Sequence, residues 1–182
     1  MIFMHKKVKD GSILYIGDYH PFYHGTNKDF DEFSNMILKL KEQDDEAVKF
    51  FYDKIKMKLG ENFTIVVVPS HSVNTKNSGI RKLAIMLAKD KKNIIDGTEC
   101  LIRIKEIKKL SHGGNRSLDI QLESMKVVKH DLIQGKDILL LDDVKTSGNT
   151  IKAAIKLLKE SGAKKVVALV LGRTITKKKK IY

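Results

Sequence analysis

The stretch that decides the fold runs from residue 136 to residue 150 and reads KDILLLDDVKTSGNT. Its four consecutive apolar residues, Ile138–Leu141, predict a strand covered on both faces, as in a parallel sheet. Two carboxylates, Asp142 and Asp143, follow, and a short loop rich in hydroxyl groups then leads into a helix. Ligands of open parallel sheets bind at the carboxyl ends of strands, so we expect the binding site here.

Outward from this stretch, apolar strands alternate with amphipathic helices. We expect strands at 13–17, 63–68, 100–104, 124–128, 136–141 and 166–171, and helices at 28–41, 44–59, 79–90 and 149–161. Buried strands that alternate with helices imply parallel strands joined by right-handed crossovers. The pattern therefore predicts an α/β fold with an open, mainly parallel twisted sheet flanked by helices.

The same pattern suggests how the chain is divided. Residues 61–176 form the expected core, and residues 177–182 form a basic tail. Residues 1–60 are expected to form a small N-terminal α/β lobe or hood that belongs to the same compact unit. The chain has 182 residues, which is long enough to bury a core without covalent cross-links.

Composition excludes several classes of protein. Cys100 is the single cysteine, so an intramolecular disulfide and a cysteine-rich zinc site are both excluded. The longest apolar runs are far shorter than the roughly 18 residues of a membrane helix, so we expect no membrane partner. The cytoplasm is the default compartment for such a chain.

The net charge of +13 has two interpretations. A basic surface can bind polyanions such as nucleic acid. Alternatively, lysines scattered over exposed faces keep the protein soluble. Lysine far outnumbers arginine, and only residues 177–180 form a run, which favours the second interpretation because nucleic-acid readers more often use arginine. Nucleic acid stays open as a partner but is not required.

The loop after the two acids has the chemistry of a phosphate site. Backbone N–H groups of a loop and a helix N-terminus together attract anions, and Gly148 allows the backbone to approach a phosphate closely. Further donors come from Thr146, Ser147, Asn149 and Thr150. Two carboxylates would repel a bare polyphosphate, so we expect them to hold hydroxyl groups or a divalent cation near the phosphate. A phosphorylated sugar has this layout, with a phosphate at one end and vicinal hydroxyls further in. For any single residue, ordinary strand-end or helix-cap roles are the simpler interpretation.

The commonest phosphate motifs are missing, but another is present. The chain contains neither G-x-x-x-x-G-K-[ST] nor G-x-G-x-x-G. The segment Leu140–Thr150 resembles the phosphoribosyl-pyrophosphate (PRPP) motif of type I phosphoribosyltransferases, with hydrophobic residues, two acids, two further residues and then Thr-Ser-Gly-x-Thr. The resemblance covers about residues 61–174. Within the family, the sequence pattern is most similar to that of the competence-protein-F-like (ComF-like) branch.

The resemblance implies roles for particular residues. Asp142 and Asp143 would be catalytic, hold the ribose 2′ and 3′ hydroxyls, and contact Mg²⁺ only indirectly through them. The other PRPP-binding residues would be Ser70 and His71 at the pyrophosphate and Lys145, Thr146, Ser147, Gly148, Asn149 and Thr150 at the 5′-phosphate. The family's mobile loop would be Lys105–Arg116, with Arg116 catalytic and Lys108 and Lys109 binding PRPP.

The expected function is that of a Mg²⁺-dependent phosphoribosyltransferase that moves phosphoribosyl from PRPP to a nucleobase-like acceptor and releases pyrophosphate. Hypoxanthine-guanine enzymes carry an acid where Thr146 stands, which argues against that substrate. The alternative is a non-catalytic PRPP- or nucleotide-binding regulator, for which a link to nucleic acid stays open. A homodimer is compatible with the resemblance.

Overall fold

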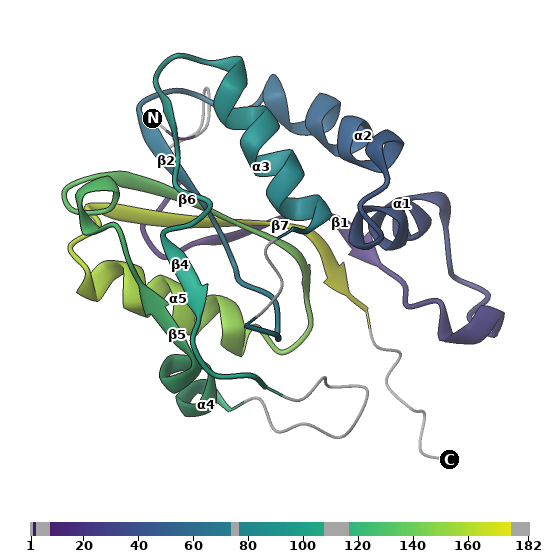
Figure 1. Cartoon of the computed structure of the whole chain (residues 1–182). Coiled ribbons are helices and arrows are strands. Elements are labelled where there is room, and N and C mark those ends of the chain that lie inside the picture. Colours follow the sequence, from purple (N-terminus) through teal and green to yellow (C-terminus); the bar gives the residue numbers. More distant parts are fainter. Residues whose placement is uncertain (1, 3–7, 74–76, 108–116, 176–182) are drawn as a thin grey trace.

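The computed structural model in Figure 1 describes residue 2 and residues 8–73, 77–107 and 117–175. Within these residues a parallel sheet has the strand order β1-β7-β6-β2-β3. Its strands are β1 (Ile13–Tyr19), β2 (Phe63–Val67), β3 (Ile94–Asp96), β6 (Asp137–Lys145) and β7 (Lys165–Thr174). The open, mainly parallel sheet expected from the sequence is therefore confirmed.

Helices cover both faces of the sheet, which makes three layers (Figure 1). One face carries α1 (Glu32–Lys41), α2 (Asp45–Lys56) and α3 (Gly79–Asp90). The other face carries α5 (Asn149–Glu160) and an antiparallel pair of strands, β4 (Leu101–Arg103) and β5 (Met125–Val127), beside α4 (Leu118–Ser124). Two 3₁₀ turns, η1 (Tyr23–Gly25) and η3 (His130–Leu132), lie in connections.

The run Ile138–Leu141 shows why the sheet needs both layers. Leu139 and Leu141 belong to the core under α1–α3, whereas Ile138 and Leu140 belong to the core under α5. All four side chains are fully buried. Successive side chains of a strand point to opposite faces, so a strand between two helical layers must be apolar at every position.

The connections create a switch point in the sheet. The crossover through α3 leads from β2 to the edge strand β3, and the crossover through α5 leads from β6 to β7 in the opposite direction. β2 and β6 are hydrogen-bonded neighbours. Connections that leave two adjacent strands in opposite directions open a crevice at their carboxyl ends, where α/β proteins bind ligands.

Strand β6 is longer than expected. The sequence predicted its end at residue 141, but it continues through Asp142 and Asp143 to Lys145. The physical reason is its neighbour: β2 ends opposite Leu141, while β7 goes on pairing as far as Lys145. The two acids are therefore held on a paired strand rather than in a loop.

Other differences concern short elements. The strands expected at 100–104 and 124–128 are present as β4 and β5, but they pair with each other and not with the main sheet. Neither β3 nor α4 was expected. Both are brief, and β3 exposes two of its three residues, so neither leaves a periodic signal in the sequence.

The N-terminal segment shares the sheet and its core. β1 pairs with β7 from Ile13 to Tyr19, and α1 and α2 pack in the same apolar cluster as α3. The helix expected from residue 28 begins at Glu32 because the Asp31 side chain accepts a hydrogen bond from the Ser34 N–H and caps it. The division of the chain at residue 60 stays a prediction. In the described part of the chain, no helix is both long and apolar enough to cross a membrane.

Candidate functional site

A cavity of about 590 Å³ opens at the carboxyl ends of β2 and β6, where the crossovers diverge. It gathers most of the site residues expected from the sequence. They are Ser70, His71, Asp142, Asp143, Lys145, Thr146, Ser147, Gly148 and Thr150. Asn149 is the first residue of α5 and lies next to this wall without being part of it.

One end of the cavity is the loop that leads into α5. Gly148 occupies the N-cap position with φ 83°, a left-handed conformation that glycine adopts without strain. A Cβ atom at Gly148 would lie 2.6 Å from Cε of Lys145, whose side chain therefore passes over the loop. The Ser147 hydroxyl accepts a hydrogen bond from the Asn149 N–H at 3.4 Å. The loop thus presents a twelve-residue helix N-terminus and a cation to the same space.

The two acids also line the cavity. The Asp143 N–H donates to Oδ1 of Asp142 at 2.9 Å, and the Val144 N–H donates to Oδ1 of Asp143. Oδ2 of Asp143 lies 3.9 Å from Nζ of Lys41, which comes from the end of α1. Both acidic side chains are partly exposed to the cavity. They are therefore oriented by the protein but open to a ligand.

Tyr19 lies behind this ion pair. Nζ of Lys41 is 5.5 Å from the centre of the Tyr19 ring, which favours the cation. Burial raises the pKa of the Tyr19 hydroxyl, and the nearby Asp143 carboxylate raises it further. Tyr19 therefore stays protonated at neutral pH, and it supports Lys41 rather than adding charge.

Another part of the cavity wall is the turn that follows β2. Ser70 and His71 line it, and the Ser70 hydroxyl donates to the Ser72 carbonyl at 3.0 Å. Ser72 itself faces a neighbouring hollow. The N-terminus of α3 adjoins the turn, because residues 77–79 also line the cavity. Two helix N-termini, those of α3 and α5, thus reach one cavity from different ends.

Most of the expected mobile loop lies outside the described residues. Lys108, Lys109 and Arg116 are among those positions, so their roles stay predictions. Lys105 is described, and its Nζ lies 3.9 Å from Glu123 Oε2 on the surface. Among the described residues no group of three or more histidine, cysteine, aspartate or glutamate side chains could hold a metal ion.

The cavity also contains residues that sequence reasoning missed. Lys41 and Gln43 come from the end of α1 and the residues after it, and Arg103 comes from the end of β4. Lys41 looks like many other lysines in the sequence, and no signal singles it out. Arg103 had a weak signal: it is one of few arginines and lies inside an otherwise apolar segment, residues 100–104.

A helix N-terminus with a lysine beside it, two oriented carboxylates and the turn after β2 surround one switch-point cavity, and together they define an α/β protein with a polar small-molecule site. The comparison with protein families agrees. Residues 37–182 match the family described as "Phosphoribosyl transferase domain". The chain belongs to this family, as its motif around Asp142 and Gly148 predicted.

Individual relatives cover different parts of the chain. An adenine phosphoribosyltransferase of Mycoplasma mobile is 26% identical over 79% of this chain and 86% of its own length. One from Mycoplasmopsis agalactiae is 47% identical over 31% of this chain and 30% of its own. The transcriptional regulator GfcR of Methanococcus vannielii is 48% identical over 23% of this chain and 20% of its own. The last two matches thus span less than a third of those relatives.

Solved structures similar to this chain include the purine phosphoribosyltransferase of Pyrococcus horikoshii. The match covers 76% of this chain and 84% of that structure, with 16% sequence identity and a TM-score of 0.38. None of these relatives carries the name of a ComF-like protein, so the assignment to that branch stays a prediction.

Proposed function

We propose that this protein is a Mg²⁺-dependent phosphoribosyltransferase that uses PRPP. The observation that carries the proposal is that one cavity brings together the loop at Gly148, the acids Asp142 and Asp143 and the turn at Ser70. PRPP carries a group for each of them: a 5′-phosphate, two ribose hydroxyls and a pyrophosphate on C1. Family membership supports this assignment.

The groups that line the cavity have different roles in this reaction. The N-terminus of α5 and Lys145 bind the 5′-phosphate, and Asp142 and Asp143 accept hydrogen bonds from the ribose hydroxyls. The turn at Ser70 and His71, with the N-terminus of α3, binds the pyrophosphate as it leaves. Because the chemistry needs little covalent help, positioning and electrostatic stabilisation supply most of the rate.

The residues fit a magnesium ion that arrives with the substrate. Mg²⁺ keeps several waters and is commonly held by one or two carboxylates together with substrate phosphates. Asp142 and Asp143 line the cavity and would reach such an ion indirectly, through the ribose hydroxyls that they hold, and the cation would neutralise charge on the pyrophosphate.

We propose a nucleobase as the acceptor, with adenine as the first candidate because curated relatives carry that name. The test is release of pyrophosphate from PRPP and Mg²⁺ in the presence of single nucleobases. Release that depends on one base would establish the activity and the acceptor together. A protein that binds no PRPP in calorimetry would contradict the proposal.

A second candidate is a PRPP-binding regulator without turnover. The observation in its favour is the match to a transcriptional regulator over the segment it shares with this chain. Tight PRPP binding with no pyrophosphate release for any base would favour this candidate over the enzyme.

A further inference from the structure

Arg103 is buried beside the cavity and binds the turn that follows β2. Its side chain is 7% exposed, and an arginine keeps its charge under all ordinary conditions. Nε donates to the Ser70 carbonyl at 2.8 Å, and Nη2 lies 3.2 Å from the Pro69 carbonyl. Nη1 donates to Oγ of Ser124 at 2.6 Å and lies 3.4 Å from Oε1 of Gln121, both on α4. Arg103 therefore ties the turn to α4 across the end of β4.

The next carbonyl of the turn is held from the same side. The Ile107 N–H, just beyond β4, donates to the His71 carbonyl at 3.1 Å. Three consecutive carbonyls, at residues 69–71, are thus bound by donors from one segment, 103–107. This arrangement gives the turn two distinct sides.

The geometry of the peptide bond determines what lies on the other side. Each peptide group is planar, and in the trans form its N–H points opposite to its carbonyl. The described residues contain no cis peptide bond. The N–H groups of residues 70–72 therefore point away from Arg103 and Ile107.

We propose that Arg103 is a positioning residue for pyrophosphate. It holds two carbonyls of the turn at Ser70 and so fixes the conformation in which this turn meets the leaving group. The inference rests on the proposed function, because it assumes that the anion at this end of the cavity is the pyrophosphate of PRPP.

The chemistry of the side chain explains why an arginine is used. Two carbonyls of one turn are bound by two nitrogens of one rigid, planar guanidinium. A lysine ammonium is a single point charge on a flexible stem, so it preserves the charge but not this fixed pair of contacts. Replacement by lysine therefore separates positioning from simple attraction of the anion.

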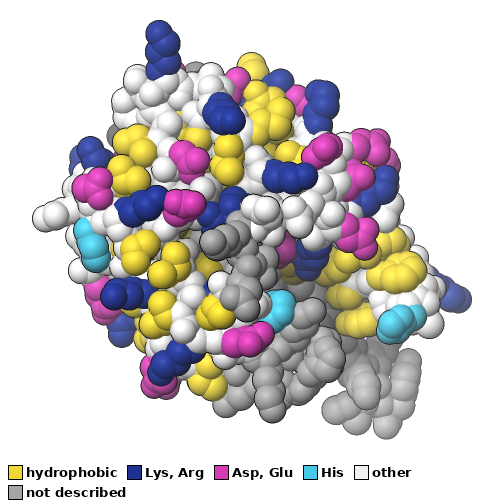
Figure 2. Space-filling model, viewed as in Figure 1, with side chains coloured by type: hydrophobic (Ala, Val, Ile, Leu, Met, Phe, Trp, Pro, Cys, Tyr) yellow, Lys and Arg dark blue, Asp and Glu magenta, His cyan; other side chains and the backbone are white. Residues whose placement is uncertain are grey.

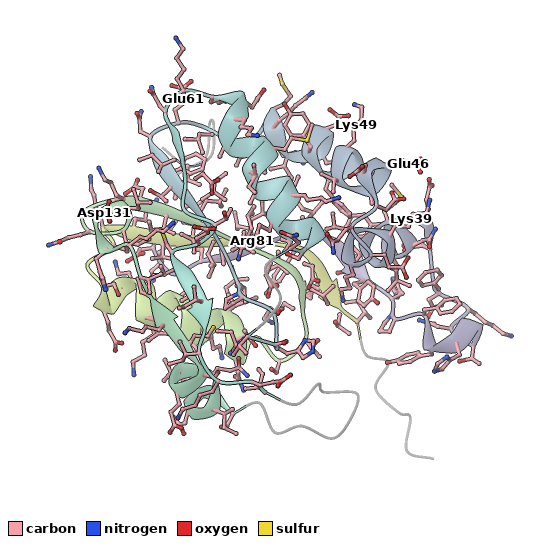
Figure 3. All side chains as sticks on the ribbon, in the orientation of Figure 1. Lys39, Glu46, Lys49, Glu61, Arg81 and Asp131 are labelled. Carbon is pink, nitrogen blue, oxygen red and sulfur yellow. The ribbon has the colours of Figure 1, made fainter. Side chains whose placement is uncertain are left out.

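The experiment measures two ligands separately on Arg103→Lys, by calorimetry with Mg²⁺. Pyrophosphate probes the turn at Ser70, and ribose 5-phosphate probes the cradle at Gly148. We expect pyrophosphate to bind about tenfold to a hundredfold more weakly, because bonds to a charged donor are lost. Ribose 5-phosphate should bind as it does to the wild-type protein. Arg81→Lys on α3 is the matched control, since it makes the same chemical change at a residue that is not a donor to these carbonyls (Figure 3).

Two results would overturn the inference. Pyrophosphate affinity that survives in Arg103→Lys would mean that a positive charge suffices. Equal loss of both ligands would mean a general structural role. If the wild-type protein binds neither ligand, the proposed function itself fails, which is a separate outcome.

A measurement on the wild-type protein keeps the test valid if the variant does not fold. The Arg103 Nε–H should be protected from hydrogen exchange with and without pyrophosphate, because it stays bound to the Ser70 carbonyl. The amide signals of residues 70–72 should shift when pyrophosphate is added. An Nε–H that becomes exposed on binding, or unchanged amide signals, would contradict the inference.

Discussion

Asp142 and Asp143 are the two acids on which, in the proposed function, PRPP binding depends. We expect the double variant Asp142→Asn, Asp143→Asn to lose at least about a hundredfold in PRPP affinity, because two hydrogen bonds to charged acceptors are weakened. The fold should persist, because the ladder with β7 is made by backbone groups, and the exposed pair with Lys41 adds little.

Calorimetry with PRPP and Mg²⁺ on the variant and the wild type tests this expectation. The matched control is Glu61→Gln with Asp131→Asn, which removes two acids that Figure 3 shows on the periphery of the molecule. Equal PRPP affinity in wild type and the Asp142, Asp143 variant would remove the basis of the proposed site.

Gly148 combines a conformational and a steric requirement. Valine at this position would have to adopt φ near 83° and would place its Cβ 2.6 Å from Cε of Lys145, where the phosphate must approach the backbone. We expect Gly148→Val to abolish measurable binding of ribose 5-phosphate and to cost about 1–3 kcal/mol of stability from backbone strain.

Gly135→Val is the control for that strain. Gly135 also has a left-handed φ, 70°, but a Cβ atom there would meet nothing within 4 Å, and it lies before β6, away from the cavity. Thermal melting and phosphate binding of both variants separate the two effects. Comparable ribose 5-phosphate affinities in the two variants would contradict a phosphate cradle at Gly148.

The fold suppresses the ionisation of the Cys100 thiol. The residue is fully buried, and burial raises the pKa of its thiol to about 11. The folded protein therefore holds the proton more tightly than the unfolded chain. The stability that this supplies is present below about pH 8.5 and is lost as pH rises through about 11.

We expect iodoacetamide to modify Cys100 slowly in the folded protein near pH 8, and at the ordinary thiol rate after unfolding. Mass spectrometry of timed reactions measures both rates. Fast modification of the folded protein would show that Cys100 is accessible as a thiolate.

At the residue scale, a candidate site could be proposed from the sequence where its residues are contiguous; the structure places most of them around one cavity, and their roles stay predictions. Residues 142–150 are neighbours in the chain, so the strand-end acids and the glycine loop can be recognised together as one motif. Lys41 and Arg103 reach the cavity from α1 and β4 only through packing, and nothing local in the sequence records that packing. Distant contributors of this kind require the fold.

At the element scale, the close approach of α1 and α3 supports the cavity wall. A Cβ atom at Gly79 would lie 1.8 Å from the Leu40 carbonyl oxygen, so only glycine allows this contact. Both residues line the cavity. We expect Gly79→Ala to lower the free energy of unfolding by about 1–3 kcal/mol or more, because backbone cannot yield as a flexible side chain does.

Urea unfolding of Gly79→Ala measures this loss. Lys89→Ala, at an exposed position on the same helix, is the control and should change stability by less than about 0.5 kcal/mol. A Gly79→Ala variant as stable as the wild type would contradict this prediction, because it would mean that α1 and α3 can move apart without a loss of stability.

Long elements were predictable for a physical reason, and short ones were not. The helices at α2, α3 and α5 each bury one stripe, which gives three or more turns of periodic sequence. The end of β6 could not be predicted, because it depends on the length of its partner β7. Likewise, the pairing of β4 with β5 is decided by tertiary contacts and not by their composition.

At the scale of the whole molecule, the charge of +13 is dispersed and not gathered into one patch on the face in view. Figure 2 shows Lys and Arg side chains interspersed with Asp and Glu on that face. Ion pairs such as Lys39–Glu46 on the outer side of α1 and α2 belong to this mixture (Figure 3). On the face in view, a dispersed charge of this kind gives only weak, general attraction to polyanions.

This distribution predicts how the protein responds to salt. We expect the protein to bind duplex DNA only non-specifically, with a Kd of about 10⁻⁴–10⁻⁶ M at physiological salt. The affinity for DNA should fall at least about tenfold between about 50 and 200 mM KCl, because each contact with a phosphate releases a condensed counterion.

The affinity for PRPP should fall less over the same range, because in the proposed function its phosphates are held inside a cavity by oriented backbone groups and not by surface charge. Fluorescence anisotropy with a labelled duplex and calorimetry with PRPP measure the two slopes on one preparation. DNA binding that stays nanomolar at about 200 mM KCl would instead favour the regulator over the enzyme.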